Sequence, residues 1–554
     1  MIKLFITWTL FCLTAKAQEM PIIEDILLKD KSNLGFTAKW SPDLAEKSSY
    51  NENSSSSFET IAGDVYSFRF DYELNKLEIS CFDKNMYRKG NAYMDIKSKN
   101  KHITELKEGE YSILGANLVN GVPSLVVFFK DSEENSYLKI IPLQTNCLVN
   151  LGKDALKSDG ISVTKLLTKS EHPNPYVSFY ASNNKKYSAI NYKIKDKESE
   201  LWDDVIIVYD STFSEIKRYE KIEYLSFGAL EPIIISNEGE IYAIAKKTIG
   251  ETKKSKQYEY RIVYGGNELN VSDIIATNEI FTIKILNEID GDVKVVKANY
   301  LVKNKDQVVI NNIEVFNLSN EGIVNKSDIE INENILLSLG ADKKKGLNNY
   351  TLKNVNNDNN NYYLVLEQDD YSSSSMSYGT LISSLFGGIT SLGGHGSSIS
   401  YTNREVGNIL VLKVKNKTNE ILWTRLMERY QSFAANNFIN YSSLFSFVAN
   451  DKLVILTNDN GSNDKENERK EKVTTRLKAS NLTAYYISET KNERYPLLIG
   501  SNEDCMVKVL SSSVTNENNI LLYGNAIAAM GKVTGKSKYG ILRIEQINLS
   551  EKTE

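Results

Sequence analysis

Three short segments decide the fold of this chain: Tyr362–Glu367 (YYLVLE), Asn408–Val414 (NILVLKV) and Ile421–Met427 (ILWTRLM). Each is rich in the β-branched, aromatic and large aliphatic residues that favour strands. The second and third are joined by the polar turn Lys415–Glu420 (KNKTNE), which predicts an antiparallel hairpin. Together the three segments predict a meander of short antiparallel strands.

Similar strand-like runs recur along the rest of the chain with turn residues between them, as expected of an all-β protein. One comparable run per group gives centres near residues 79, 140, 207, 262, 314, 411, 485 and 542, at intervals of 61, 67, 55, 52, 97, 74 and 57 residues. This recurrence predicts a β-propeller of seven or eight four-stranded blades, although the intervals exceed the about 40–50 residues of a typical blade. Tandem β-sandwich domains are the alternative fold.

Three segments carry expectations about particular connections. Asp290-Gly291, between two strand-like runs, predicts a hairpin turn. Ser48–Ser57, rich in Ser and Asn, predicts a loop. Ile22–Leu28 predicts a spare strand, which we expect to complete the last blade and close the ring.

The hairpin Leu412–Trp423 resembles the repeat of pyrroloquinoline-quinone-type propellers, in which an apolar strand leads into Asp-x-x-Thr-Gly and a Trp follows four residues after the Gly. Thr418 and Trp423 fit this pattern, whereas Lys415 stands in place of the Asp and Asn419 in place of the Gly. The resemblance implies a propeller, with eight blades as one option. It does not extend to the catalytic and calcium-binding residues of the quinone enzymes, and we expect no cofactor.

Residues 1–17 predict a secretory signal peptide. Lys3 precedes the apolar run Leu4–Leu13, and Ala15-Lys16-Ala17 offers the small residues that a signal peptidase reads. Cleavage there leaves residues 18–554, which we expect to form one exported propeller domain, periplasmic or secreted. No later stretch reaches about 18 uninterrupted apolar residues, so no transmembrane helix is predicted.

Three cysteines follow the signal peptide: Cys81, Cys147 and Cys505. One disulfide is conceivable, with the third thiol left over. Because Cys81 and Cys505 lie in strand-like sequence, we expect small buried side chains rather than a stabilising disulfide framework.

The formal net charge is −5, from 66 basic and 71 acidic residues. A nucleic-acid-binding protein would be expected to carry a basic stripe. This sequence has none, so nucleic acid is not an expected partner.

Residues that could carry catalysis or hold a metal are scattered. His102, His172 and His395 are isolated and lack the spacing of zinc hydrolases. The segment Asn458–Asp464 is rich in oxygen ligands but lacks the register of a calcium loop, so we expect a solvated polar loop without a metal.

Adjacent acids occur at strand ends in Asp203-Asp204 and Asp369-Asp370. Neighbours in a strand point to opposite faces of the sheet, so neither pair suits acid/base catalysis.

The most unusual segment is the insertion at about 371–400, between two partner strands. Its serines and glycines predict flexibility, and apolar side chains recur at helix-like spacing: Leu381, Ile382, Leu385, Phe386, Ile389 and Leu392. Exposed apolar side chains on a flexible segment predict a contact element for a partner or a membrane surface. The alternative is a loop that folds over one mouth of the ring and buries them.

These observations predict a non-catalytic binding or scaffolding protein that holds a protein, a glycan or a cell-envelope component on a loop face. The competing class is a carbohydrate-active hydrolase or lyase. Carboxylates about 5–10 Å apart around a central channel would favour the hydrolase. A channel lined with apolar or uncharged groups would favour the scaffold. The oligomeric state is not predicted.

Overall fold

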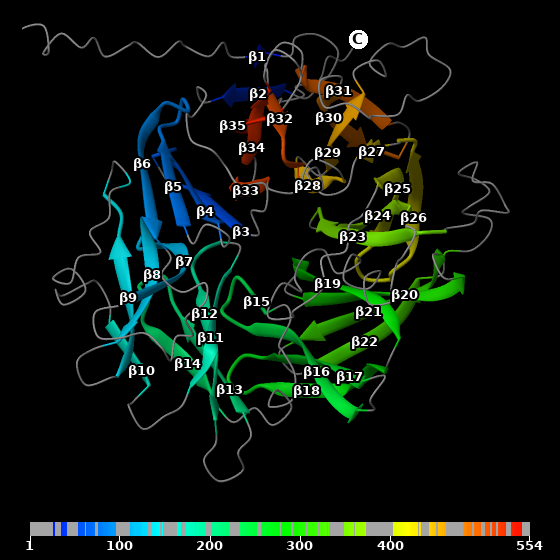
Figure 1. Ribbon diagram of the computed structural model, residues 1–554. Coiled ribbons are helices and arrows are strands. Elements are labelled where there is room, and N and C mark those ends of the chain that lie inside the picture. The colour runs from blue at the N-terminus through cyan, green and yellow to red at the C-terminus, as the bar shows by residue number, and fades with distance from the viewer. Residues whose placement is uncertain are drawn as a thin grey trace, which may run out of the picture.

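The meander predicted around residues 361–427 is present in the computed structural model (Figure 1). β24 (Asn361–Ser372) pairs with β25 (Asn403–Lys415), and β25 pairs with β26 (Ile421–Met427). β23 (Tyr350–Asn357) lies on the other side of β24, and the short β27 (Gln431–Phe433) also pairs with β25. These strands make up one blade.

Eight such antiparallel sheets form a ring, and the described residues contain no α-helix (Figure 1). The all-β propeller prediction is therefore confirmed with eight blades, and the tandem-sandwich alternative is wrong. Blade 1 consists of β3 (Ser54–Glu59), β4 (Val65–Asp71), β5 (Lys76–Phe82) and β6 (Arg88–Asp95); blade 2 of β7 (Tyr111–Val119), β8 (Val122–Lys130), β9 (Ser136–Pro142) and β10 (Val163–Leu167); blade 3 of β11 (Pro173–Ala181), β12 (Ser188–Lys195), β13 (Trp202–Tyr209) and β14 (Glu215–Tyr219).

The remaining blades follow in chain order around the ring. Blade 4 consists of β15 (Ile234–Ile235), β16 (Ile241–Glu251), β17 (Lys256–Gly265) and β18 (Asn270–Thr277); blade 5 of β19 (Ile280–Ile289), β20 (Asp292–Asn304), β21 (Gln307–Ser319) and β22 (Gly322–Ile329); blade 6 of β23–β27; blade 7 of β28 (Phe445–Ala449), β29 (Lys452–Asn460), β30 (Ser480–Ile487) and β31 (Asn492–Ile499). The pairing expected across Asp290-Gly291 is confirmed, since Ile289 pairs with Asp292.

The structure describes the eight sheets and the tight turns between their strands. These are residues 26–27, 35–40, 54–60, 62–71, 76–95, 111–130, 135–144, 147, 163–167, 173–182, 184–195, 202–220, 233–251, 256–277, 279–289, 292–304, 307–319, 322–329, 331, 348–358, 360–372, 403–429, 431–433, 443–449, 452–460, 480–489, 492–499, 505–509, 512–516, 519–527 and 533–545.

Blade 8 joins the two ends of the chain. Its C-terminal strands are β32 (Cys505–Val507), β33 (Ser513–Asn516), β34 (Asn519–Ile527) and β35 (Val533–Glu545). β2 (Gly35–Trp40) pairs with β35 from Gly35↔Glu545 to Trp40↔Gly540, and β1 (Ile26–Leu27) pairs with β2. The sequence placed the closing strand at Ile22–Leu28. The structure corrects this: β2 completes the blade, and the predicted segment contributes only β1 at its outer edge.

The core is divided among the interfaces between blades. Within the described residues, one hydrophobic cluster fills each of the eight interfaces. In β24, Leu364 and Leu366 pack toward blade 5, whereas Tyr363 and Val365 pack toward blade 7. Successive side chains of a strand point to opposite faces, and both faces here are covered, so the strand is apolar without alternation.

The two faces of the ring differ. Since neighbouring strands are antiparallel, the turns after the first and third strands of blades 1–7 lie on one face, here the turn face. Connections after the second and fourth strands lie on the opposite face, the connection face. Adjacent turns bond to each other between blades: Asn120 N donates to Ser211 O at 2.9 Å, and Asn184 N donates to Asn237 Oδ1 at 3.1 Å.

One turn explains a departure from the propeller repeat. Asn419, which stands in place of the repeat's Gly, has φ of 54°, in the left-handed region that Gly and Asn favour. Its side chain also accepts from the Tyr362 hydroxyl at 2.7 Å. Trp423 packs edge-on against Tyr363, with ring centroids 5.9 Å apart.

Three sequence expectations need correction. Ser54–Ser57 were assigned to a loop but belong to β3, because serines give no apolar alternation even where the backbone is fully paired. Asn458–Asn460 belong to β29 rather than to a polar loop. The cysteines are the third case.

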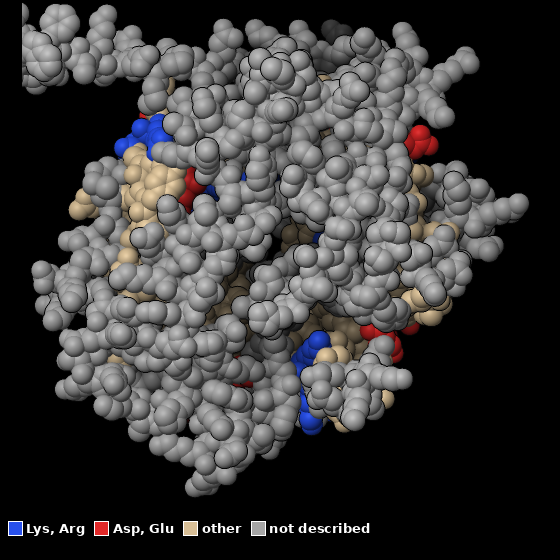
Figure 2. Space-filling view, in the orientation of Figure 1, with Lys and Arg blue, Asp and Glu red and all other residues tan. Residues whose placement is uncertain are grey.

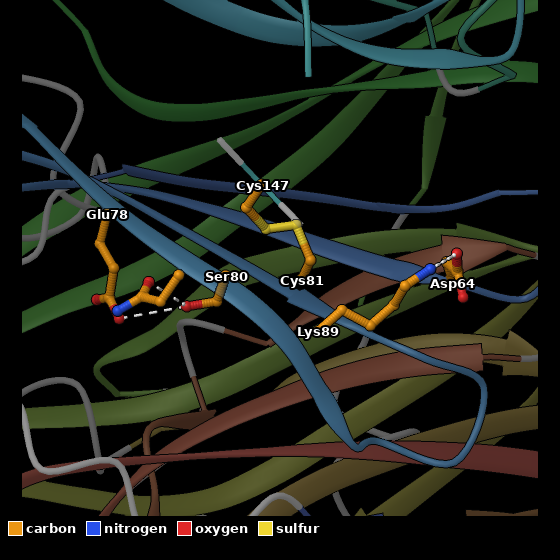
Figure 3. Close-up of a disulfide and its surroundings, with 7 residues drawn as sticks. Asp64, Glu78, Ser80, Cys81, Lys89 and Cys147 are labelled. Carbon is orange, nitrogen blue, oxygen red and sulfur yellow. Dashed lines mark hydrogen bonds and ion pairs between the residues drawn. A yellow bond between two sulfur atoms is a disulfide. The ribbon is translucent and has the colours of Figure 1, made fainter. Parts of the chain in front are cut away.

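Cys81 and Cys147 form a disulfide between blades 1 and 2, with Cα atoms 5.8 Å apart (Figure 3). Both are fully buried, as expected of small side chains, but the expectation that they stay unbonded is wrong. Cys81 lies on β5, and Figure 3 places it between Ser80 and the ion pair of Lys89 with Asp64 (Nζ–Oδ2, 2.6 Å). The bridge crosses the hydrophobic cluster that joins the two blades.

Candidate functional site

The first strand of each blade lies nearest the centre of the ring (Figure 1). These inner strands are β3, β7, β11, β15, β19, β23 and β28, with β32 and β33 in blade 8, and neighbours such as β19 and β23 contact each other. Figure 2 shows a hollow in the middle of the ring, with described side chains in its wall. This hollow is the central channel.

Charged residues are few on the inner strands that the structure describes. The acids are Glu59 and Glu288, and the bases are Lys284 and Lys353. The acids belong to blades 1 and 5, which are opposite in a ring of eight. The Glu59 carboxylate accepts from Asn519 Nδ2 at 2.6 Å. The described inner strands therefore bring no two acids to the same blade or to neighbouring blades.

The two lysines, in contrast, lie on adjacent inner strands. On β19, Ile280 and Leu286 pack toward blade 6, so Lys284, in the same alternation, projects to that side. Lys284 is partly buried and has no hydrogen-bonding or ion-pair partner within the described part of the chain. Burial and the nearby charge of Lys353 lower the pKa of Lys284. We call Lys284 and Lys353 the lysine pair.

Lys353 lies beside a buried carboxylate. Its Nζ is 3.6 Å from Glu367 Oε2 on β24, and the Glu367 side chain is fully buried. Glu367 also accepts from Arg429 NH2 at 2.5 Å and from Ser443 Oγ at 2.5 Å. One carboxylate therefore faces two cations of blade 6.

Arg429 is held by blades 6 and 7 together. Its NH1 donates to Thr457 Oγ1 at 2.7 Å and to Ser443 O at 3.1 Å. Gln431 accepts from Ser443 N through its Oε1 at 3.1 Å. Because these groups are all buried, the network fixes Glu367 and, through it, the position of Lys353.

A buried phenol borders the lysine pair on the blade 5 side. Tyr300 on β20 accepts from Thr282 Oγ1 and from Leu352 N, each at 3.0 Å. Burial raises the pKa of Tyr300, while these hydrogen bonds and the charge of Lys353 oppose that rise. Tyr300 thus bonds β19 to β23 next to the lysine pair.

Uncharged polar groups continue the wall from blade 6 to blade 7. Asn354 Nδ2 and Asn356 Nδ2 donate to Ser446 Oγ at 2.9 and 2.8 Å. Partly buried aromatic rings lie on other inner strands, at Phe179, Tyr180 and Phe445. Amides, hydroxyls and aromatic faces are groups that bind sugar hydroxyls and the C–H faces of sugar rings.

The residues singled out from the sequence do not meet at this site. The six apolar residues of the insertion and the histidines at 102, 172 and 395 lie outside the described residues. Asp204 is buried and accepts from Asn191 Nδ2 at 3.1 Å. Asp459, expected in a metal-free polar loop, pairs with Arg494 NH2 at 2.8 Å.

Sequence reasoning did not single out Lys284 and Lys353. The available signal was a lysine within a strand-like run at the start of a blade, as in Ile283-Lys284-Ile285. That signal becomes specific only once the inner strands are known, because lysines also occur within other strands, such as Lys139 on β9 and Lys297 on β20.

Among the described residues, no group of three or more His, Cys, Asp and Glu side chains is arranged to hold a metal ion. The described residues also contain no helix that is long and apolar enough to cross a membrane.

No protein-family model matches this chain. No curated protein matches it either. Solved structures do match, among them an acylaminoacyl peptidase of Pyrococcus horikoshii, at 9% identity and a TM-score of 0.31, over 89% of this chain and 58% of that one. The polysaccharide lyase Uly1 matches at 8% identity and a TM-score of 0.34, over 89% of this chain and 90% of that one.

A mutant of the Synechocystis apocarotenoid oxygenase matches at 7% identity and a TM-score of 0.32, over 91% of this chain and 92% of that one. This chain spans less than two thirds of the peptidase chain. The three proteins differ in activity, so the likeness concerns the fold alone.

Proposed function

We propose that this protein is an exported, non-catalytic binding protein that holds a glycan or protein partner with the loops and inner wall of the propeller. The observation that carries the proposal is the makeup of the described inner strands. They place two acids on opposite blades and otherwise uncharged groups and the lysine pair around the channel. That wall suits recognition better than hydrolysis by paired carboxylates.

Two features support export. Residues 1–17 have the pattern of a signal peptide. The buried disulfide Cys81–Cys147 suits an oxidising compartment, because cytosolic thiols are kept reduced. We infer a periplasmic or secreted protein.

The apolar insertion is proposed as the partner-contacting element on the connection face. It joins Ser372 of β24 to Asn403 of β25, which pair at the end of blade 6 opposite the turn Lys415–Glu420. Its six apolar residues would enlarge that face for a protein or envelope component.

The test is partner capture by intact protein and by a variant lacking residues 380–396. We expect the deletion to lose partners that the intact protein retains. A matched control replaces the exposed Lys186 of the turn face with Met, which should change nothing. Recovery of the same partners by both proteins would eliminate the insertion as the contact element.

A polysaccharide lyase is the second candidate, and the lysine pair is the observation that favours it. Burial and the charge of Lys353 lower the pKa of Lys284, which is the direction that favours the neutral amine needed for a general base. In β-elimination the neutral amine would take the proton next to a sugar carboxylate held by Lys353. The C–O bond to the neighbouring sugar would then break, and its oxygen would take up a proton. Release of an unsaturated sugar from an acidic polysaccharide would establish this activity.

A further inference from the structure

The hairpin of β16 and β17 protrudes from the connection face of blade 4. Its two strands pair as far as Glu251↔Lys256, whereas the outer strand β18 pairs with β17 only as far as Glu259. The hairpin therefore ends as a two-stranded ribbon beyond β18. Ile249, near this end, is 48% exposed and lies at a register shift of the pairing. We call residues 246–251 the blade 4 tip.

The hairpin of β20 and β21 protrudes in the same way from the neighbouring blade 5. Its strands stay paired to their ends, but the inner strand β19 pairs with β20 only as far as Tyr300. Beyond that point, Leu301 is 56% exposed and Val302 is 40% exposed. Successive residues of a strand point to opposite faces, so an apolar side chain is exposed on each face of this ribbon. We call residues 301–304 the blade 5 tip.

Large apolar side chains are exposed elsewhere in the described residues only on outer strands or next to tight turns. Those on outer strands are Tyr93, Ile216, Ile274, Val324 and Leu422, and those next to tight turns are Val122 and Val514. Within the described part of the chain, the connection face therefore presents such side chains at the blade 4 tip and the blade 5 tip.

Lysines accompany the apolar residues on blade 4. Lys246 and Lys247 of the blade 4 tip are partly exposed, and Lys246 Nζ lies 4.1 Å from the centre of the Tyr258 ring. The sequence that joins β16 to β17, residues 252–255 (TKKS), adds two more lysines. The corresponding connection of blade 2, residues 131–135 (DSEEN), is acidic instead. Blade 4 is therefore a basic part of the connection face.

A lipid surface fits these tips better than a folded partner does. A rigid partner would cover one face of a ribbon, whereas lipid head groups can surround a protruding ribbon on both faces. The tips belong to separate blades, and a flat, fluid surface can accept both without a groove between them. Membrane binding of this kind grows with buried apolar area and with the attraction of lysines to anionic lipids.

We propose that Ile249, Leu301 and Val302 insert into the head-group region of an anionic phospholipid membrane, and that the lysines of the blade 4 tip contact the lipid phosphates. The turn face then points away from the membrane. This inference goes beyond the proposed function, because it concerns the surface on which the protein rests and not the partner that it holds.

The experiment measures sedimentation of the full chain with two kinds of vesicle, phosphatidylcholine alone and phosphatidylcholine mixed with phosphatidylglycerol. We expect binding to the anionic vesicles to be roughly tenfold tighter or more at low salt. The preference should shrink at high salt, because salt screens the attraction between exposed charges.

The apolar contribution is tested by a triple variant, Ile249→Ser/Leu301→Ser/Val302→Ser. Binding to anionic vesicles should weaken by roughly fivefold or more, because the side chains that would insert lose their apolar area. The matched control changes three exposed apolar residues of outer strands and should bind like the unmodified protein: Ile216→Ser, Ile274→Ser and Val324→Ser.

The charge contribution is tested by Lys246→Gln/Lys247→Gln, which should weaken binding and reduce its dependence on salt. Lys185→Gln/Lys186→Gln, a change of two adjacent lysines on the turn face, should do neither. Melting temperatures of all variants are compared, so that a loss of folding is distinguished from a loss of binding. Leu301→Trp should tighten binding, because tryptophan favours the membrane–water interface.

The inference is overturned if the intact protein does not bind anionic vesicles, or if it binds zwitterionic vesicles equally well. It is also overturned if either tip variant binds like the unmodified protein, or if the outer-strand variant loses as much binding as the apolar tip variant. Partner capture by the protein lacking residues 380–396 is measured without vesicles, so the failure of one proposal is distinguishable from the failure of the other.

Discussion

Arg429 is the residue whose surroundings most constrain the structure near the channel. Its side chain and that of Glu367 are both fully buried, and the pair joins blade 6 to residues of blade 7. A buried ion pair is costly to desolvate, but breaking it leaves an uncompensated charge inside the protein. The pair therefore contributes more to the positions of its neighbours than to net stability.

Replacing Arg429 with Met should lower the free energy of unfolding by about 3–5 kcal/mol, because Glu367 would remain buried without its main cation. Urea denaturation measures the change. Arg218→Met is the matched control, since the Arg218–Glu215 pair has the same chemistry at 2.8 Å but both side chains are about a third exposed. Exposed pairs contribute about 0–1 kcal/mol. Equal losses in the two variants would contradict the role given to Arg429.

At the scale of the element, the blade interface is the unit that the sequence specifies. Each interface has its own hydrophobic cluster within the described residues, and the interface of blades 5 and 6 adds a hydrogen bond from Lys294 Nζ to Asn416 O at 3.1 Å. Blades 1 and 2 share a disulfide. In blade 5, Glu314 on β21 accepts from Lys326 Nζ at 2.5 Å and from Lys297 Nζ at 2.9 Å.

Glu314 predicts an acid-dependent loss of stability in blade 5. Burial alone would raise its pKa, but hydrogen bonds from Lys326, Lys297 and Asn299 and the charge of Lys297 outweigh burial and set the pKa at about 2. The folded-state pKa is below the unfolded value of about 4.3, so the stabilisation is present above that pH. It is lost as the pH falls from about 4.3 to about 2.

Glu314→Gln should therefore be less stable than the unmodified protein at neutral pH, and the difference should shrink through that acid range. Urea denaturation at a series of pH values measures it, with Glu215→Gln as the exposed control. A difference that stays constant between pH 6 and pH 2 would show that the charge of Glu314 is not what stabilises the blade.

The blades were predictable from sequence where strands are covered on both faces. Runs such as Leu364-Val365-Leu366 are apolar at every position, which is expected of a strand that is buried on both faces. The neighbouring blades bury both faces here. The inner strand β3 was missed because its serines leave no apolar pattern. The lysine pair was missed because Lys284 and Lys353 are 69 positions apart (353 − 284) and only the ring order makes them neighbours.

For the whole molecule, closure of the ring is the feature on which the rest depends. β2 supplies an outer strand to blade 8 and pairs with Gly540–Glu545 of β35, whose other edge pairs with β34. An open edge would present unpaired backbone groups to other chains.

Removing residues 18–41 should leave β35 exposed on one side. We expect the melting temperature to fall by about 5 °C or more, since six residue pairings are lost and each hydrogen bond contributes about 0.5–1.5 kcal/mol. We also expect association at high protein concentration. Calorimetry and light scattering measure the two effects.

A shorter truncation, of residues 18–24, keeps β1 and β2 and is the control. Addition of a peptide spanning residues 26–41 should restore part of the lost stability. If the long and short truncations melt at the same temperature, closure by β2 is not a source of stability.

The pairing of β2 with β35 also determines when blade 8 can form during synthesis of the chain. Gly35 and its partner Glu545 are 510 residues apart (545 − 35). At about 5–20 residues per second, the ribosome needs roughly 25–100 s to make the second strand after the first. During that interval β2 exists without its partner, and blades 1–7 can be completed before blade 8. The start of the chain must therefore remain available, and free of other strand partners, until the last blade has been made.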